Sequence, residues 1–168
     1  MTKQQFLDSI KLHTVIVMRG APGSGKSTLV EAVKARFRVA HCSADHHRMK
    51  DGRYVFNPAE NDNAHGGCMR DFVEAVQGLG DFEVVICDNT NTTLPECSPY
   101  VSVAKAYGWT PVVVTVLADP ERAAARNLHG VPPDKVLQMY EKVVSHTRYI
   151  PGHWQHVTID NDKESEAA

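Results

Sequence analysis

The stretch Gly20-Ala21-Pro22-Gly23-Ser24-Gly25-Lys26-Ser27-Thr28 decides the fold of this chain. It follows an apolar run at residues 14–18 and leads into a helix-like run at residues 27–37. Strand, then G-x-x-x-x-G-K-[ST], then helix is the context that a phosphate-binding loop requires. The glycines allow a tight turn in which successive backbone N–H groups converge on phosphate oxygens, and the helix N-terminus adds further donors. The stretch therefore predicts binding of a nucleoside triphosphate.

Residues of this loop have distinct expected roles. We expect the Lys26 ammonium to reach the β- and γ-phosphates and to take part in catalysis, and the Ser27 hydroxyl to ligate Mg²⁺. The other expected contacts to the nucleotide come from Ala21, Pro22, Gly23, Ser24, Gly25 and Thr28. The expected cofactors are accordingly ATP and Mg²⁺.

Composition bounds the size and setting of the protein. The chain has 168 residues, of which 42% are hydrophobic and 23% charged, and this length is typical of one compact domain. We expect that domain to span residues 1–160 and an acidic, disordered tail to span residues 161–168. No run is long enough to cross a membrane and no apolar signal segment follows Met1, so a cytoplasmic location is expected.

Charge and cysteine usage limit the classes of partner and site. A formal net charge of −2 argues against a protein that coats nucleic acid by bulk electrostatics, yet it leaves room for a narrow basic pocket that grips one strand end. The four cysteines have neither C-x-x-C nor zinc-finger spacing, which favours buried free thiols. The oligomeric state stays open.

Apolar, β-branched runs alternate with helix-like segments along the chain. Such continuous runs predict parallel strands buried on both faces. The expected strands are residues 14–18, 38–42, 83–87 and 110–117, with a possible short fifth at 156–159. The expected helices are residues 27–37, 58–79, 95–107, a short one after Asp119-Pro120-Glu121, and 134–149. The predicted fold is α/β: a doubly wound parallel sheet of four to five strands, with helices on both faces and a short helical lid.

Asp45 is the best candidate for the group that activates an acceptor hydroxyl. It follows the second expected strand, and the carboxyl ends of strands line the ligand crevice of a doubly wound sheet. A carboxylate there can accept the proton of the hydroxyl. Arg48, three residues on, could clamp an anionic acceptor. The competing interpretations are an N-cap or a solvated loop acid for Asp45 and a surface charge for Arg48.

Asp88 closes the third expected strand, in the run Val84-Val85-Ile86-Cys87-Asp88. An acid at this place beside a phosphate loop is typical of a Walker-B carboxylate that holds Mg²⁺ directly or through water. Asp also caps strand ends and begins turns, so this signal is less specific than the loop. The following Thr90 and Asn91 could hydrogen-bond the acceptor.

Arg122 and Arg126 lie four residues apart on the short helix beyond the fourth strand, so they share one helix face. Gly130 and the prolines after it could form a hinge. A lid that carries arginines onto the γ-phosphate stabilises charge and expels water during transfer. A solvated helix face is the alternative interpretation.

Taken in order, these motifs resemble those of the phage-type polynucleotide 5′-kinase domain, and parts of the set resemble related AAA-like and zeta-toxin kinases. The resemblance spans about residues 15–149. The motifs that carry it are the Pro-Gly-Ser-Gly loop core, Asp45 with Arg48, Asp88-Asn89-Thr90-Asn91, Ala104-Lys105-Ala106-Tyr107-Gly108-Trp109, Arg126-Asn127, Gly130-Val131-Pro132, Val136-Leu137 and Met139-Tyr140.

The resemblance implies roles for several of these residues. It implies that Asp45 is the catalytic carboxylate, that Arg48 contacts the 3′-side phosphate of the acceptor, that Asp88 organises the acceptor pocket, and that a lid arginine touches the transferred phosphate. The family has a second basic residue shortly after its Arg-Asn pair, where this chain has only His129. The phosphatase domain often fused to such kinases is missing here, so a stand-alone kinase is expected.

The expected function is ATP- and Mg²⁺-dependent transfer of the γ-phosphoryl group to a hydroxyl on nucleic acid, most simply the 5′-OH of a strand end. The alternatives are phosphorylation of the hydroxymethyl group of a modified pyrimidine within DNA, as in related phage kinases, and a small-metabolite or nucleotide kinase. A non-enzymatic alternative is a nucleotide-gated ATP-binding module that acts through a partner. The sequence ranks neither DNA against RNA nor ATP against GTP.

Overall fold

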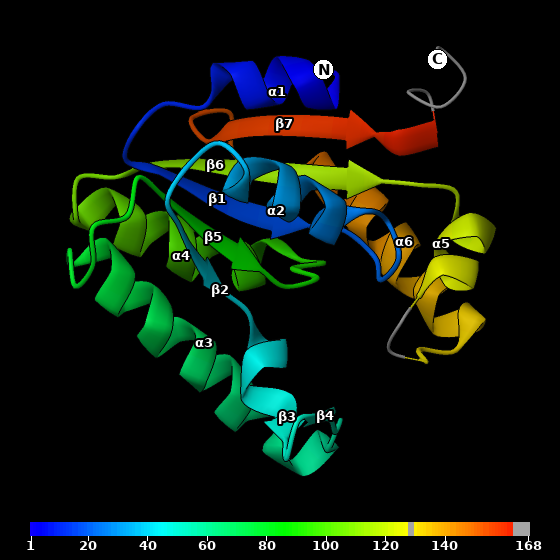
Figure 1. Cartoon of the computed structure of the whole chain (residues 1–168). Helices are drawn as coiled ribbons and strands as arrows, with labels where there is room; N and C mark the ends of the chain where they lie inside the picture. Colours follow the sequence, from blue (N-terminus) through cyan, green and yellow to red (C-terminus); the bar gives the residue numbers. More distant parts are fainter. Residues whose placement is uncertain (128–129, 163–168) are drawn as a thin grey trace.

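A five-stranded parallel sheet forms the centre of the computed structural model, which describes residues 1–127 and 130–162. The strand order is β2-β5-β1-β6-β7 (Figure 1). The bounds are β1 Thr14–Arg19, β2 Val39–Cys42, β5 Val84–Asp88, β6 Thr110–Leu117 and β7 Gln155–Asp160. All four expected strands and the possible fifth are present. The predicted α/β fold with a doubly wound parallel sheet is therefore confirmed.

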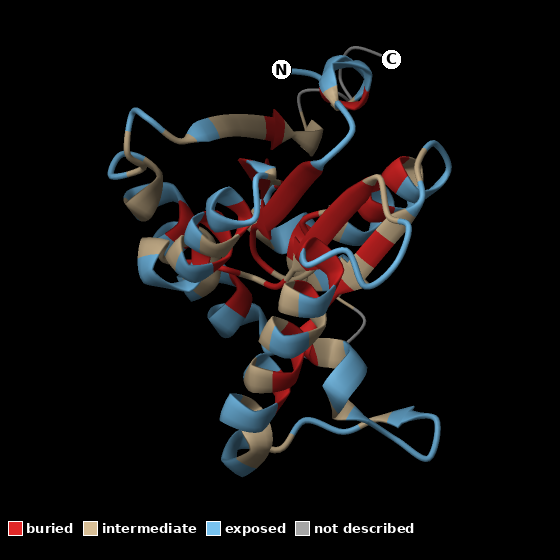
Figure 2. Cartoon of the chain, turned by 90° about the vertical axis from the view of Figure 1, so that its left-hand side faces the viewer, coloured by how far each residue is buried: buried red, intermediate tan, exposed pale blue. Residues whose placement is uncertain are grey.

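Alternate residues of the central strand face the two layers of helices. Val15 and Val17 of β1 pack under α3 (Asn61–Val76) and α4 (Leu94–Ala106). Ile16 and Met18 pack under α1 (Lys3–Ser9) and α2 (Lys26–Lys34), on the other face. Every residue of β1 is buried, which is why its sequence reads as an unbroken apolar run rather than an alternating one. Figure 2 shows this buried centre between more exposed helices.

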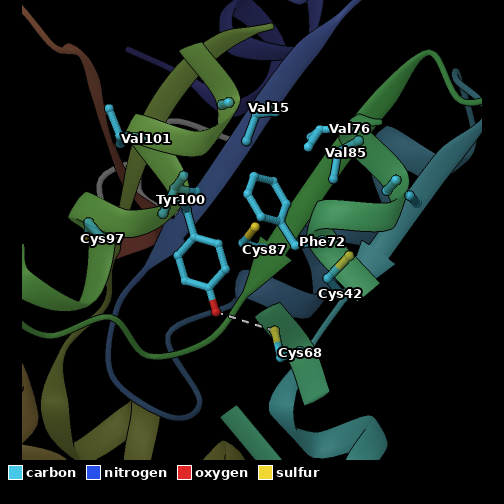
Figure 3. Packing of buried hydrophobic residues seen from close by; sticks show 14 of the residues in the cluster. Val15, Cys42, Cys68, Phe72, Val76, Val85, Cys87, Cys97, Tyr100 and Val101 are labelled. Atoms are coloured by element: carbon cyan, nitrogen blue, oxygen red, sulfur yellow. Dashed lines mark hydrogen bonds between the residues drawn. The ribbon is translucent and has the colours of Figure 1, made fainter. Parts of the chain in front are cut away.

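The layer beneath α3 and α4 contains the four cysteines, all of them free and buried (Figure 3). The rings of Phe72 and Tyr100 meet edge to face there, with centroids 5.1 Å apart. Burial raises the pKa of the Cys42 and Cys97 thiols to about 12. These thiols are therefore protonated and unreactive at neutral pH, as the sequence predicted for buried free cysteines.

Two further helices follow β6: α5 (Pro120–Arg126), which is the helix predicted as a lid, and α6 (Pro133–Thr147). The Asp119 side chain caps α5 by accepting hydrogen bonds from the backbone N–H groups of Glu121 and Arg122. The small buried cluster Ala21, Ala118, Ala123 and Val136 packs the two helices against the phosphate loop. The junction between α5 and α6 includes positions 128–129, so the expected role of His129 lies outside the described residues.

Several short elements were not expected from the sequence. They are α1, the 3₁₀-helices η1 (Ala44–Arg48) and η2 (Pro58–Glu60), and the hairpin of β3 (Met49–Lys50) and β4 (Arg53–Tyr54). The expected helix at 58–79 consequently divides into η2 and α3 and ends at Val76. Each missed element is seven residues or shorter, which is too short to display a hydrophobic period. Local hydrogen bonds define them instead, such as the capping box between Thr2 and Gln5 that begins α1.

The predicted tail requires a correction at its first two residues. Asn161 donates a hydrogen bond to the Ser24 carbonyl, and Asp162 accepts one from the backbone N–H of Asp119. These contacts hold the end of β7 against the phosphate loop and α5. The rest of the expected tail, 163–168, lies outside the described residues. Among the described helices, none is both long and apolar enough to cross a lipid bilayer.

Candidate active site

The carboxyl ends of the parallel strands meet at one edge of the sheet, where a cleft of about 1050 Å³ opens. Ligands of open α/β sheets bind at this edge. The phosphate loop follows β1, η1 follows β2, Asp88 ends β5, α5 follows β6, and Asn161 follows β7. The predicted site residues that line the cleft are Pro22, Gly23, Gly25, Lys26, Ser27, Thr28, Asp45, Arg48, Asp88, Thr90 and Arg126. The fold thus brings most of the predicted residues together.

Lys26 lies folded back into its own loop. Its ammonium donates to the carbonyls of Gly20 and Ala21, over 3.0 and 2.9 Å. Burial lowers the pKa of Lys26, and the nearby charges of Asp88 and Asp45 act in the opposite direction. The ammonium is thus held among neutral carbonyl oxygens, within the field of two carboxylates. Phosphate oxygens would be stronger partners for it than these carbonyls are.

The environment of the buried Ser24 hydroxyl indicates whether the loop can hold a phosphate group. It is 2% exposed and has no hydrogen-bond partner among the described residues. A buried polar group without a partner is costly, and a bound anion would supply acceptor oxygens at this position. The loop therefore fits the triphosphate that the sequence predicts.

Gly23 provides a first testable prediction, because its backbone has φ +75° and a Cβ there would lie 1.9 Å from the Ala123 carbonyl oxygen of α5. Gly23→Ala should cost about 1–2 kcal/mol for the left-handed backbone and more for the collision. Gly108→Ala is the matched control, since Gly108 has φ +77° and open space around it. Denaturant unfolding should show a larger loss for Gly23→Ala, and titration with ATP should show weaker binding for that variant alone. Equal losses of stability with intact binding would contradict the close packing of the loop against α5.

Asp45 is held by contacts within the 43–48 segment and by one contact from that segment to Asn89. The Ser43 side chain caps η1, and the Ala44 N–H donates to the Asn89 side-chain oxygen over 3.0 Å. Asn89 follows β5 directly, so η1 is fixed to the neighbouring strand of the sheet. The Asp45 carboxylate accepts a hydrogen bond from Arg48 over 2.5 Å, and its side chain is 38% exposed. The carboxylate therefore lines the cleft while Arg48 holds it, and Tyr54 also interacts with it.

The Arg48 side chain is more deeply buried than its predicted role as a clamp would suggest. It is 14% exposed, donates to Asp45 and to the Asn61 side chain, and lies under the ring of Phe56. Arg48 lines the cleft, as predicted, but part of its hydrogen-bonding capacity is used to hold Asp45. Its cation also balances the negative charge of the Asp45 carboxylate.

The underside of η1 rests on α3. His47 contacts Asp71 over 2.7 Å, and a Cβ at Gly67 would lie 2.5 Å from the His47 ring. The small residue at 67 therefore allows η1 to approach α3 closely. This packing positions the whole 43–48 segment that carries Asp45.

Asp88 and Ser27 line the same cleft, as expected for the residues that would hold Mg²⁺. The Asp88 carboxylate is 13% exposed and lies 3.3 Å from His41. The described residues contain no cluster of three His, Cys, Asp or Glu side chains that could hold a metal alone. Magnesium in phosphoryl-transfer sites takes only one or two protein oxygens and completes its shell with phosphate oxygens and water. One hydroxyl and one carboxylate fit that requirement.

Four predicted site residues do not line the cleft, namely Ala21, Ser24, Asn91 and Arg122. Asn91 is 4% exposed and its amide donates to the Met18 carbonyl, so it ties the loop after β5 to the end of β1. Arg122 points to Asp162, at 3.3 Å, and does not line the cleft. These two positions are corrected accordingly: their side chains are engaged in contacts that shape the walls of the site. Ala21 and Ser24 are buried and belong to the loop through their backbone.

Three residues near the site were missed by sequence reasoning. Lys135, near the start of α6, lines the cleft and is a second cation there, nine residues after Arg126. Asn161 braces the phosphate loop through the Ser24 carbonyl. Arg19 is fully buried and donates to the Thr92 and Val143 carbonyls, which joins the end of β1 to α6. Of these three, only Lys135 could have been found from the sequence, because it is a basic residue in the first turn of an expected helix.

Comparison with known proteins agrees with this geometry. Residues 15–135 match the AAA domain family AAA_33, which is more than half of the chain. The chain belongs to this family. Human NEDD4-binding protein 2 is similar to the AAA domain described here, with 28% identity over 132 residues. That match covers 76% of this chain but 7% of the human protein.

Solved structures share the fold of this AAA domain. A chain of the Pnkp1/Rnl/Hen1 RNA repair complex superposes with a TM-score of 0.67 at 17% identity, covering 86% of this chain and 48% of that one. A chain from the PezAT toxin–antitoxin system of Streptococcus pneumoniae gives 0.66 at 15% identity, covering 95% and 78%. A chain of the AvrRxo1-ORF1:-ORF2 complex with ATP gives 0.58 at 17% identity, covering 88% and 52%. At these identities the likeness establishes the P-loop kinase-like fold alone.

Proposed function

We propose that this protein is an ATP- and Mg²⁺-dependent kinase that transfers the γ-phosphoryl group to a hydroxyl of nucleic acid, most simply the 5′-OH of a strand end. The observation that carries the proposal is that one cleft contains both the phosphate loop and Asp45 with Arg48. A protein that only switches with nucleotide needs the loop but has no use for a base aimed at an acceptor.

The proposed mechanism assigns a step to each side of the cleft. The loop amides and Lys26 bind the triphosphate, and Asp45 accepts the proton of the attacking hydroxyl as the new O–P bond forms. Ser27 and Asp88 would hold Mg²⁺, which neutralises phosphate charge when it is bound. Arg126 and Lys135, on α5 and α6, add positive charge at the transferred group and help to exclude water. Arg48 keeps Asp45 oriented.

Nucleic acid is the proposed acceptor for two reasons. The motifs from the phosphate loop to Met139-Tyr140, taken in order, resemble the polynucleotide 5′-kinase domain. In addition, a chain of an RNA repair complex shares the fold. The cationic Arg48 at the acceptor side of the cleft agrees with an anionic acceptor.

The experiment that tests the proposal is transfer from γ-labelled ATP to a panel of acceptors. The panel contains 5′-OH DNA, 5′-OH RNA, duplex DNA with hydroxymethyl-pyrimidine, and free nucleosides, with 5′-phosphorylated strands as the matched control. We expect label on 5′-OH strands, loss of labelling when EDTA removes Mg²⁺, and none on the 5′-phosphorylated control. Labelling of free nucleosides alone would contradict a nucleic-acid acceptor, and ATP hydrolysis with no labelled acceptor would favour a binding module. Labelling confined to the hydroxymethyl-pyrimidine duplex would move the acceptor to a base.

A further inference from the structure

The β3–β4 hairpin places an exposed aromatic ring at the edge of the cleft. The chain leaves η1 at Arg48, turns at Asp51 and Gly52, both with positive φ, and returns so that the Val55 N–H donates to the Arg48 carbonyl. The two-residue turn suits this short hairpin. Figures 1 and 2 show the hairpin projecting away from the sheet. Phe56, just beyond β4, is thereby placed over Arg48, whose Cζ lies 5.4 Å from the ring centroid.

Phe56 differs from every other phenylalanine of the chain in its exposure. All five lie within the described residues, and Phe56 is the one classed as exposed, at 57%, whereas Phe6 and Phe72 are at most 2% exposed. Phe56 and Tyr54 line the same cleft as Asp45 and the phosphate loop. More than half of the Phe56 surface is exposed and the ring lines the cleft, so it is available to a molecule that binds there.

The charge around the ring indicates the chemistry of that molecule. Segment 48–56 carries three cationic side chains and one anionic one, in a chain whose net charge is negative. Lys50 pairs with Glu60, and Arg48 lies beneath the ring. Aromatic faces flanked by cations are the surface on which single-stranded nucleic acids stack their bases. An apolar protein segment would not use the cations.

We propose that Phe56, with Tyr54 beside it and Arg48 beneath it, is a stacking platform for the unpaired base at the accepting end of a nucleic-acid strand. This inference rests on the proposed function and deepens it, because it names the substrate class. A base inside a duplex has both faces covered by its neighbours, so a platform of this kind selects single-stranded or overhanging ends over blunt and recessed ones. Burial and the Asp45 carboxylate raise the pKa of Tyr54, whose hydroxyl interacts with Asp45.

The test compares Phe56→Ala with Phe56→Trp. Base–aromatic stacking is worth about 1–3 kcal/mol per base, so Phe56→Ala should raise KM for a single-stranded 5′-OH oligonucleotide by about 5- to 150-fold. KM for ATP should not change, and Phe56→Trp should restore acceptor binding. An acceptor whose terminal nucleotide lacks its base should have the same KM with the wild type and with Phe56→Ala. Val55→Ala is the matched control, because Val55 is an exposed apolar hairpin residue that does not line the cleft.

A binding measurement keeps this inference separable from the proposed function. An oligonucleotide with 2-aminopurine at its 5′ end should lose fluorescence on binding the wild type and Phe56→Trp, and should keep it with Phe56→Ala. If Phe56 is needed for this quenching although no strand is phosphorylated, the platform stands and the kinase proposal fails. If Phe56→Ala binds and quenches like the wild type, the platform is wrong, whatever the result of the transfer assay.

Discussion

Asp45→Asn should abolish most phosphoryl transfer while ATP binding survives. A positioned general base contributes about 10²- to 10⁴-fold to rate, and we expect a loss in that range in single-turnover transfer from labelled ATP. Asparagine keeps the shape of the side chain and an oxygen that can accept from Arg48, so the contacts that fix η1 persist. What disappears is the carboxylate that takes the proton. The Kd for ATP, measured by calorimetry, should stay near the wild-type value because the phosphate loop is untouched.

Asp81→Asn is the control for this prediction. Asp81 is also an aspartate and lies on the loop before β5, away from the cleft. Its side chain is 85% exposed and pairs with Arg38. An exposed ion pair of this kind contributes little to stability. The control should transfer phosphate at the wild-type rate. If Asp45→Asn also transfers within about tenfold of that rate, Asp45 is not the base, because such a loss lies below the usual range for this group.

Lys26→Met should remove both ATP affinity and transfer. The ammonium is held inside the loop by the Gly20 and Ala21 carbonyls, where a phosphate would compete for it. Methionine preserves the length of the stem without the charge. Removing one preorganised donor from a charge-stabilising site costs about 10²- to 10³-fold in rate, and we expect at least that loss together with weaker ATP binding. Burial lowers the pKa of Lys26, so methionine relieves the cost of a buried charge, although it also removes the two hydrogen bonds to the loop carbonyls.

Lys105→Met provides the comparison for this loss. Lys105 is an exposed lysine in the last turn of α4 that does not line the cleft. It should bind ATP and transfer phosphate like the wild type. Wild-type ATP affinity in Lys26→Met would show that the loop does not bind a triphosphate through this residue. Wild-type transfer together with that affinity would remove the basis of the proposed function.

The position of η1 could not be predicted from the sequence. In the 43–48 segment the sequence assigns roles only to Asp45 and Arg48. The position of the segment depends on Asn89 after β5 and on the packing of His47 against Gly67 of α3. These partners lie 20 or more residues away in sequence. No local period or turn signal reports such contacts. The same reason explains Asn91 and Arg122, whose predicted roles did not take account of the Met18 carbonyl and Asp162.

The sequence by itself determined the parallel sheet, the phosphate loop and the approximate place of Asp45, because buried strands, a glycine-rich turn and an acid after a strand are local patterns. Tertiary structure alone decided which side chains share the cleft. It placed Lys135 and Phe56 at its edge, turned Arg122 toward Asp162, and laid Asn161 against the loop. The physical reason is that strands distant in sequence end at one edge of the sheet, and packing between their loops sets the direction of each side chain.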